Sequence, residues 1–535
     1  MALLKINNQE IDASSGMSIF QMAKEMDIAI PSSCHQQGKC KECLIEIKSG
    51  HEFLSPPSKA EAHLTENFRL ACEARISGNG DISCQTMKRS QIIIEDQSAF
   101  SEKEFQLDPA VKNMDGFVFL DNQLIDRYHG SLLGLAIDIG TTTVVVKLVN
   151  LENGHLLATH SFENPQRYAG SNVMSRILYD TTYGKKELKR ILTAHLAKAI
   201  HLLTDKTEQI YEVVVGGNTT MRDLFFGLDV KTIGQTPYTS ISENQLKTKE
   251  LNSTALVSNG RKMGLPIFPK ARVYGLPLIG SHVGADTTAT LLAIDFEHQT
   301  EPVIIMDIGT NTEIVIGHKD LAFSASSPSG PAFEGGGITF GMPALPGAIE
   351  KIKILEDGQV QFKTINNQPE VGICGSGLID ILGELIRTEQ INSLGRLEDD
   401  DRFMVSKESN IYLSENDINL LAQTKGANAA ALNILIKEMG LQFKDIQKFY
   451  IAGGFGRHLD IEASIKIGLL PDLPRERFVQ IGNAAIDGCV QALRNKKRRN
   501  QYEQFVQKIK TINLESDPDF FDYFVNGCQF IPIET

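Results

Sequence analysis

The sequence is poor in cysteine, with eight residues among 535, five of them before residue 85. So sparse a set does not form a disulfide scaffold, and its clustering near one end indicates metal or redox chemistry. The chain also lacks the run of roughly 18 apolar residues that a membrane-spanning helix needs. Its first residues, "MALLKINNQEI", show neither a basic segment nor a long apolar one. We therefore expect no secretory signal, no membrane association and a cytoplasmic location.

Basic residues are outnumbered, with 53 Lys and Arg against 66 Asp and Glu and a net charge of −13. A general nucleic-acid binder usually shows a basic face, so we expect no nucleic-acid partner. The only dense basic run, "RNKKRR" (494–499), is interpreted as a solvated helix end. Apolar residues make up 42% of the chain, as in ordinary globular proteins, and the length predicts several domains.

Two common phosphate-binding motifs are missing as well. No G-x4-G-K-[ST] sequence occurs, which excludes a P-loop, and no strand–GxGxxG–helix unit supports a dinucleotide fold. A nucleotide bound by this chain must therefore be held by another kind of backbone turn.

Residues 1–90 predict a compact α+β module. "ALLKI" and "EIDAS" alternate as strands around Asn7 and Asn8, Ser18 can cap a helix over "IFQMAKEM", and "CLIEIKSG" alternates as a further strand. This order of strands, helix, cysteine loop and strand is that of a β-grasp fold. Residues 91–130 show no clear period, and we interpret them as a linker.

Three cysteines share one loop in the spacing Cys34-x5-Cys40-x2-Cys43, with Cys72 and Cys84 further on. A zinc site normally shows two paired knuckles or a late His pair, and no second knuckle follows. A thioredoxin-type dithiol opens a helix, whereas this pair precedes a strand. Four thiolates delivered by a close-wrapping loop fit a [2Fe–2S] cluster best, with zinc or a dithiol as the alternatives.

The loop is one residue longer than the plant-type C-x4-C-x2-C spacing. It resembles the adrenodoxin-like or bacterial ferredoxins. That resemblance implies a fourth ligand in an "RLxC" turn, which "RLAC" supplies as Cys72. The predicted metal ligands are therefore Cys34, Cys40, Cys43 and Cys72, and Cys84 is interpreted as a buried strand thiol.

From residue 131 long apolar strands alternate with helices, which indicates an α/β architecture. "LAIDIGTTTVVVKLV" (135–149) and "VIIMDIGTNTEIVIG" (303–317) repeat a strand, Asp-Ile-Gly-Thr, a polar turn and a second strand. Such a duplication predicts two lobes, 131–300 and 301–499, and leaves a tail, 500–535, unassigned. The turns can cradle phosphate oxygens. The preceding Asp138 and Asp307 suit a hydrated Mg²⁺.

A third element, "FYIAGGFGRHLDIEASIKIGLLP" (449–471), runs from an apolar strand into two glycines and a helix-like stretch. Together with the two hairpins it resembles the actin-like (ASKHA, ribonuclease H-like) ATPases, whose two lobes close on ATP and Mg²⁺. The resemblance assigns three sets of nucleotide-binding residues: Gly140, Thr141 and Thr142; Gly309, Thr310 and Asn311; and Gly453, Gly454 and Phe455 beside the nucleoside.

One more carboxylate belongs to the candidate catalytic set. "SHVGADTTA" (281–289) offers Asp286 as a metal ligand or water-positioning group, although a helix N-cap before Thr287 explains it equally well. The candidate catalytic residues are therefore Asp138, Asp307 and Asp286. "VVVGGNTTMRDLFFG" (213–227) adds Gly216, Gly217 and Asn218 as a loop after a buried strand.

Three long motifs accompany these domains: "NPQRYAGSNVMSRI" (164–177), "SGPAFEGGGITFGMPALPGAIE" (329–350) and "CGSGLIDILGEL" (374–385). With the ferredoxin-to-ATPase order they resemble the reductive activators of corrinoid proteins, up to about residue 495. The resemblance implies one-electron transfer from the [2Fe–2S] cluster to an inactive Co(II) corrinoid. ATP drives this step, and Co(I) is needed for methyl transfer. The implied partners are a corrinoid protein of a methyltransferase system and an upstream low-potential electron donor.

Family members often carry a small extra domain in the linker, and only the 40 residues 91–130 are available here. A homodimer formed through such a domain is therefore left open. Activators of 2-hydroxyacyl-CoA dehydratases share the ATPase fold but bridge a [4Fe–4S] cluster and lack a fused ferredoxin. An ATPase-coupled redox regulator is the other alternative, and a kinase with an accessory cluster would need a catalytic base that the sequence does not offer unambiguously.

Overall fold

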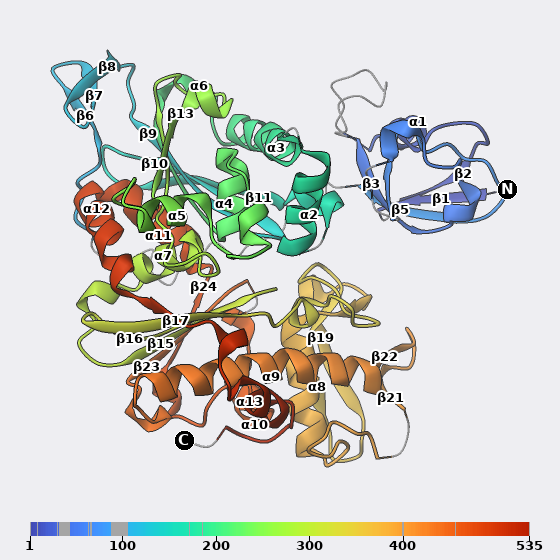
Figure 1. Cartoon of the computed structure of the whole chain (residues 1–535). Helices are drawn as coiled ribbons and strands as arrows, with labels where there is room; N and C mark the ends of the chain where they lie inside the picture. The colour runs from blue at the N-terminus through green and yellow to red at the C-terminus, as the bar shows by residue number, and fades with distance from the viewer. Residues whose placement is uncertain are drawn as a thin grey trace. The chain divides into compact units, whose positions relative to one another are not determined.

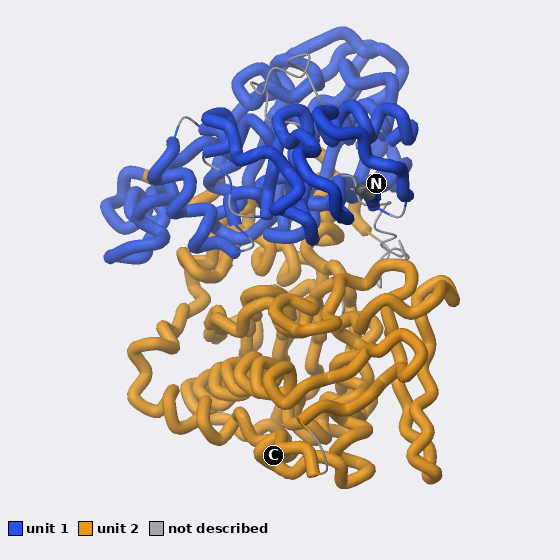
Figure 2. The backbone as a smooth tube through the Cα atoms, turned by 90° about the vertical axis from the view of Figure 1, so that its right-hand side faces the viewer, with its two compact units in different colours: residues 1–95, 111–250, 256–275 blue, residues 96–110, 251–255, 276–535 orange. Residues whose placement is uncertain are grey.

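A computed structural model describes residues 2–86 apart from 8, 29, 31–42, 63, 65 and 66, and residues 105–533 apart from 171, 185, 399, 400 and 455. Two compact units are present, one made of residues 1–95, 111–250 and 256–275 and the other of 96–110, 251–255 and 276–535 (Figure 2). Across the described helices, none combines the length and apolar character required to span a membrane.

The N-terminal module is a five-stranded mixed sheet in the order β2-β1-β5-β3-β4. Its strands are β1 (Ala2–Ile6), β2 (Gln9–Ala13), β3 (Leu44–Ser49), β4 (Phe68–Leu70) and β5 (Ile82–Thr86) (Figure 1). The helix predicted after Ser18 is α1 (Ile19–Glu25). Ser18 caps it through a capping box, and Ile19, Met22 and Ala23 are its buried residues. The β-grasp prediction is confirmed.

Part of the segment interpreted as a linker is folded. Residues 111–127 form an antiparallel sheet of β6 (Val111–Met114), β7 (Phe117–Leu120) and β8 (Gln123–Arg127). Its two tight turns are at Asp115-Gly116 and Asp121-Asn122, all four with positive φ, as two-residue hairpins require. The linker interpretation is therefore wrong for these residues. The sequence did not reveal the short strands because most of their side chains are exposed and no apolar alternation marks them.

The first ATPase-like lobe is built on a six-stranded sheet in the order β11-β10-β9-β12-β14-β13. Its strands are β9 (Leu133–Ile139), β10 (Thr143–Asn150), β11 (Leu156–Glu163), β12 (Ile210–Gly217), β13 (Leu256–Asn259) and β14 (Arg272–Gly275). The helices are α2 (Val173–Tyr183), α3 (Glu187–Leu203), α4 (Thr219–Phe226), α5 (Ile241–Lys247) and α6 (Gly260–Met263) (Figure 1). Every residue of β9 and β12 is buried, which explains their continuous apolar runs.

The second lobe repeats this arrangement in the order β24-β23-β15-β16-β17-β25. Its strands are β15 (Val303–Ile308), β16 (Thr312–His318), β17 (Leu321–Ser327), β23 (Lys448–Ala452), β24 (Phe478–Gly482) and β25 (Lys510–Thr511). In both lobes three antiparallel strands lead into two parallel ones. The duplicated two-lobed α/β fold predicted from the repeated hairpins is thereby confirmed.

Further elements complete the second unit. Its helices are α7 (Ala285–Ala293), α8 (Gly375–Arg387), α9 (Glu415–Glu438), α10 (Ile461–Lys466), α11 (Ala484–Arg494), α12 (Lys496–Phe505) and α13 (Phe520–Gly527). Its small sheets comprise β18 (Ala348–Ile354), β19 (Val360–Thr364) and β20 (Gly372–Ile373), and β21 (Arg402–Ser406) with β22 (Ile411–Ser414). The tail left unassigned is folded too, since Lys425 of α9 donates to the carbonyls of Gly527, the last residue of α13, and of Gln529 just after it.

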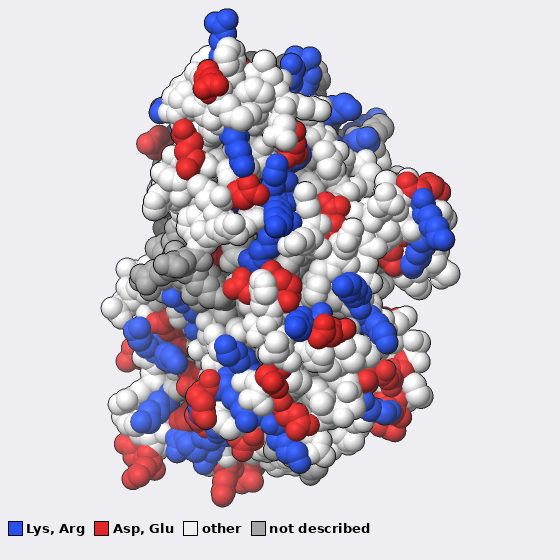
Figure 3. All heavy atoms as spheres, turned by 90° about the vertical axis from the view of Figure 1, so that its left-hand side faces the viewer, with Lys and Arg blue, Asp and Glu red and all other residues white. Residues whose placement is uncertain are grey.

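The basic run at 494–499 is not the solvated helix end expected. Arg499 is only 1% exposed. The Arg498 guanidinium donates to Glu297 Oε2 at 3.0 Å and to the Leu292 carbonyl at 2.8 Å. The run joins α11 to α12, and two of its arginines serve internal packing. On the face drawn in Figure 3, basic and acidic side chains are interspersed.

Candidate functional site

The β3–β4 pair brings two of the predicted ligand cysteines together. Cys43 directly precedes β3 and Cys72 follows β4, and Leu44 pairs with Leu70 in the antiparallel register. The Ala71 N–H donates to the Cys43 carbonyl at 2.7 Å. The two Sγ atoms lie 3.3 Å apart, and both side chains are buried. Cys34 and Cys40 lie outside the described residues.

Cys84 has a different environment. It lies on β5, where its pattern of alternating burial turns it into the sheet core, and it is 0% exposed. Burial raises the pKa of its thiol to about 12. The 3.3 Å approach of Cys72 Sγ to Cys43 Sγ therefore favours Cys72 over Cys84 as the fourth ligand.

A buried ion pair holds β4 in place. Arg69 Nε donates to Glu61 Oε1 at 2.8 Å, and the backbone N–H groups of Leu70 and Ser58 donate to the same carboxylate, each at 2.8 Å. Burial alone would raise the pKa of Glu61, but the hydrogen bonds from Arg69, Ser58 and Leu70 outweigh it and lower the pKa. Glu61 therefore fixes the strand that ends two residues before Cys72.

The first hairpin joins β9 to β10. Asp138 is buried on β9, and the Gly140 N–H donates to the Thr143 carbonyl at 3.0 Å. A Cβ on Gly140 would lie 2.6 Å from that carbonyl oxygen, so only glycine permits this turn. Thr141 and Thr142 form the tip and are half-buried.

Two asparagines flank this turn. Asn164 Nδ2 donates to the Gly140 carbonyl at 2.8 Å, and Asn218 Nδ2 donates to Thr141 Oγ1 at 2.9 Å. Asn218 also caps α4, because its side chain accepts the Met221 N–H. The Gly216-Gly217-Asn218 stretch ends β12, which runs parallel to β9 with Gly216 opposite Asp138. It therefore lies beside the hairpin within the same lobe.

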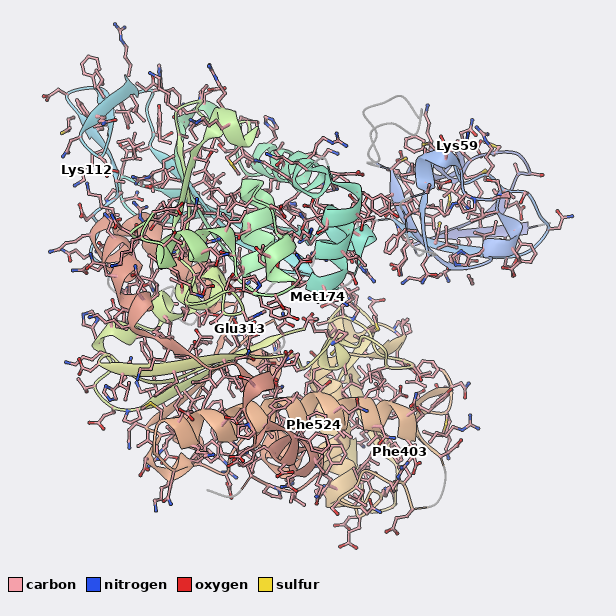
Figure 4. The ribbon with its side chains drawn as sticks, in the orientation of Figure 1. Lys59, Lys112, Met174, Glu313, Phe403 and Phe524 are labelled. Atoms are coloured by element: carbon pink, nitrogen blue, oxygen red, sulfur yellow. The ribbon has the colours of Figure 1, made fainter. Side chains whose placement is uncertain are left out.

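The second hairpin joins β15 to β16 and carries a second carboxylate that the prediction missed. Glu313 of β16, labelled in Figure 4, lies directly opposite Asp307 of β15 in the antiparallel register. Side chains opposite each other in this way share one face of the sheet. The signal was present in the sequence, since Glu313 is a lone charge in the apolar run of β16.

Burial raises the pKa values of two carboxylates near the second hairpin, and for Glu313 the charges of neighbouring carboxylates add to the effect. Burial, and then the charges of Asp286 and Asp307, raise the pKa of Glu313 well above its ordinary value. Burial likewise raises the pKa of Asp286 to about 6. Asp286 accepts the Thr287 N–H at 2.7 Å in the first turn of α7. The second unit therefore has three acidic groups near the second hairpin, and Glu313 interacts electrostatically with the other two.

These carboxylates do not form a closed metal cage. Among the described residues no group of three His, Cys, Asp or Glu side chains is arranged to hold a metal ion. Mg²⁺ keeps several of its waters and takes only one or two protein carboxylates. The residues present thus fit a hydrated Mg²⁺ held partly by phosphate better than an all-protein site.

A further carboxylate contacts the turn itself. Thr310 Oγ1 donates to Glu334 Oε2 at 2.5 Å, and Glu334 belongs to the short 3₁₀ turn η7 (Ala332–Glu334). Burial raises the pKa of Glu334. This residue lies in the 329–350 motif, and no spacing in the sequence places it against a hairpin 24 residues earlier. Gly309 and Asn311 complete the turn.

The predicted nucleoside element also meets the second hairpin. β23 is parallel to β15 with Ala452 opposite Asp307, and Gly453 follows with φ +102°. A Cβ on Gly453 would lie 2.3 Å from the Ile308 carbonyl oxygen. Gly454 has open space around its Cα, and Phe455 lies outside the described residues.

Known protein families match nearly the whole chain. Residues 4–77 match a 2Fe–2S iron–sulfur cluster binding domain, residues 133–299 the RACo middle region, and residues 301–535 the C-terminal ASKHA domain of RACo. A solved structure of a reductive activator for corrinoid, iron–sulfur protein superposes with a TM-score of 0.71 and 27% identity. It covers 99% of this chain and 98% of its own. The chain belongs to the reductive activators of corrinoid proteins.

Curated relatives of this reductive-activator family agree. The corrinoid activation enzyme RamQ of Eubacterium limosum is 27% identical over 99% of this chain and 98% of its own length. A [Co(II) methylated amine-specific corrinoid protein] reductase of Methanosarcina barkeri is 24% identical over 76% of this chain and 79% of its own. The ferredoxin match spans residues 4–77. It therefore includes Cys72 and ends before Cys84.

Proposed function

We propose that this chain uses ATP to drive the transfer of one electron to the Co(II) corrinoid of a partner protein, which becomes Co(I). The electron comes from a low-potential donor and passes through the N-terminal domain. The observation that carries the proposal is the fusion of a buried cysteine pair, 3.3 Å apart, with two Asp-Ile-Gly-Thr hairpins in one chain. Full-length similarity to corrinoid-protein activators supports it.

The donor set fits an iron–sulfur cluster. Cys43 and Cys72 are buried at the ends of paired strands, and Cys34 and Cys40 would supply the other two thiols. When bound, a [2Fe–2S] cluster supplies a one-electron carrier. The protein's own part is to hold β4 in place through the Glu61–Arg69 pair and to keep Cys72 near the strand end.

The hairpins are proposed to hold the nucleotide. The amides and hydroxyls at Gly140, Thr141 and Thr142 suit phosphate oxygens, as do those at Gly309, Thr310 and Asn311. Asp307 suits a hydrated Mg²⁺, with Asp138 as its counterpart in the first lobe. Asp286, whose pKa is raised to about 6, is proposed to accept a proton from an attacking water, while Glu313, which interacts electrostatically with Asp286 and Asp307, stays protonated until a cation binds.

The direct test is anaerobic reduction of a Co(II) corrinoid protein by the chemically reduced full-length chain. We expect the Co(I) absorbance band to grow with ATP and not with ADP. Absence of a Co(I) signal with ATP, despite ATP hydrolysis and a reduced cluster, would contradict the reductase. ATP binding that changes with the oxidation state of the cluster, without Co(I) formation, would instead identify an ATPase-coupled redox regulator.

The cofactor is tested by matched cysteine variants. Cys72→Ser should lose the visible absorbance of the reconstituted cluster, because Cys72 lies beside Cys43, whereas Cys84→Ser should keep it, because Cys84 is packed in the sheet core on β5. Iron and sulfide content should follow the absorbance. The reverse pattern would reassign the fourth ligand to Cys84.

A further inference from the structure

Arg176 is a buried guanidinium that the proposed function does not yet use. It lies on α2, the helix that also carries the exposed Met174 labelled in Figure 4, and is itself 1% exposed. Its Nη2 donates to the Thr141 carbonyl at 2.6 Å, its Nε to the Gly170 carbonyl at 3.1 Å, and its Nη1 to Met221 Sδ at 3.0 Å. The residue therefore contacts the tip of the first hairpin.

No carboxylate among the described residues accepts a hydrogen bond from Arg176; its acceptors are two carbonyls and a weakly accepting thioether. Arg222, the other fully buried arginine of this lobe, donates to Asp223 Oδ1 at 3.0 and 2.7 Å. A buried cation without a counter-ion is costly, so structures normally provide one. Burial, and then the charge of Arg167, lower the pKa of Arg176 to about 9, although Glu163 partly opposes this.

The segment from Asn164 to Arg176 hydrogen-bonds the carbonyl groups of residues 140–142. Asn164 Nδ2 binds the Gly140 carbonyl at 2.8 Å, Arg176 binds that of Thr141, and the Asn164 N–H binds that of Thr142 at 2.7 Å. In a trans peptide the N–H points opposite to the C=O. Fixing the carbonyls of Gly140 and Thr141 therefore turns the N–H groups of Thr141 and Thr142 away from this segment.

Those two N–H groups are available to a ligand. Within the part of the chain that the structure describes, neither the Thr141 nor the Thr142 N–H donates to another residue. Successive free backbone amides form a concavity that binds anions. The turn thus offers amide donors on one side and, on the other, a guanidinium that hydrogen-bonds no carboxylate among the described residues.

We propose that Arg176 is a positioning residue that orients the first hairpin and supplies the positive charge balancing the phosphates of a nucleoside triphosphate held there. The inference rests on the proposed binding of ATP at this hairpin. This role accounts for the 164–177 motif, because Asn164 and Arg176 lie near its two ends and both hydrogen-bond the first hairpin. Phosphates bound at this turn would add to the partial compensation that the charge of Glu163 already gives the buried cation.

Three full-length variants test it. Arg176→Met removes the charge and the donors at similar volume, Arg176→Lys keeps the charge, and Arg190→Met removes an exposed arginine of α3 as the matched control. Binding of ATP is measured by calorimetry and binding of adenosine by saturation-transfer NMR. Circular dichroism and the unfolding temperature report folding. Arg176→Lys keeps the test usable if the Met variant does not fold.

We expect Arg176→Met to weaken ATP binding about tenfold or more, to leave adenosine binding within about twofold, and to lose more than Arg176→Lys. Equal losses of affinity for ATP and for adenosine would mean that Arg176 only stabilises the local structure, and would overturn the inference. So would unchanged ATP binding, or equal losses in the Lys and Met variants. If the unmodified chain binds no ATP, the proposed function fails instead, which is a distinct result.

Discussion

The two hairpins of the repeat share a strand–turn–strand frame but differ in the chemistry around them. Donors surround the first: Asn164, Arg176 and Asn218 all contact the turn. Carboxylates surround the second: Glu334 contacts the turn, and Glu313 lies opposite Asp307. The first hairpin is suited to an anion and the second to a cation with its waters.

A one-residue difference in register underlies part of this contrast. In the first hairpin Ile139 pairs with Val144, so Asp138 faces Val145. In the second Ile308 pairs with Thr312, so Asp307 faces Glu313. Had the second hairpin kept the first one's register, Asp307 would face Ile314. Because a strand's side chains alternate, a shift of one residue changes which of them share a face.

The largest effect should come from removing the central carboxylate of the second hairpin. Asp307→Asn keeps the size and shape of the side chain but loses the charge suited to Mg²⁺. We expect ATP hydrolysis to fall by about 100-fold or more, with ATP binding affected far less. Steady-state phosphate release and calorimetry measure the two quantities.

Asp320→Asn is the control for this change, since Asp320 is exposed in the turn between β16 and β17 of the same lobe. It should hydrolyse ATP at the normal rate. If Asp307→Asn hydrolyses ATP as fast as the control, the second hairpin does not hold the catalytic cation.

A smaller effect should follow from giving the first hairpin the character of the second. Asn218→Asp keeps the α4 cap, because a carboxylate accepts the Met221 N–H equally well. It adds a negative charge next to Thr141, where we propose a phosphate is held. ATP affinity should fall about tenfold, with little change in unfolding temperature.

Asn172→Asp is a matched control. Asn172 caps α2 by accepting the Ser175 N–H, but its side chain is exposed and makes no hydrogen bond to the first hairpin among the described residues. It should leave ATP affinity unchanged. An equal loss in both variants would show that net charge, rather than proximity to the first hairpin, governs binding.

Much of this site could be predicted from local pattern. The repeated Asp-Ile-Gly-Thr turns, the Gly453-Gly454 element and the capped helix after Ser18 depend on residues close together in the sequence. The strand register that pairs Leu44 with Leu70, and so joins Cys43 to Cys72, depends on a distant contact. The role of Cys72 as the fourth ligand was therefore predicted only through the resemblance to ferredoxins.

The groups that set each hairpin's charge could not be predicted in the same way. Arg176 reaches Thr141 across 35 residues and Glu334 reaches Thr310 across 24, and no sequence period encodes either contact. The β6–β8 sheet was missed for a different reason. Its Asp-Gly and Asp-Asn turns were readable hairpin signals, but the three short strands beside them bury few residues and show no apolar alternation.

The smallest effect concerns the pH dependence of the second hairpin. Glu313 has a raised pKa, so the folded protein binds its proton at pH values where the unfolded chain has released it. The free energy of unfolding therefore falls as pH rises above the ordinary glutamate pKa. Glu313→Gln removes this contribution. Without nucleotide or Mg²⁺, its unfolding temperature should match the parent at pH 5 and exceed it by a few degrees at pH 8.

The exposed Glu356→Gln, in the turn between β18 and β19, changes the same net charge and should show no such pH-dependent gain. A gain for Glu313→Gln that is equal at pH 5 and pH 8 would mean that improved packing, not relief of charge repulsion, stabilises the variant. The gain should also disappear when Mg²⁺ and ATP are added, because a bound cation compensates the carboxylates that Asp286, Asp307 and Glu313 contribute. A gain that persists with Mg²⁺ and ATP would show that these carboxylates do not bind the cation of the nucleotide. The second hairpin would then not differ from the first as a cation site.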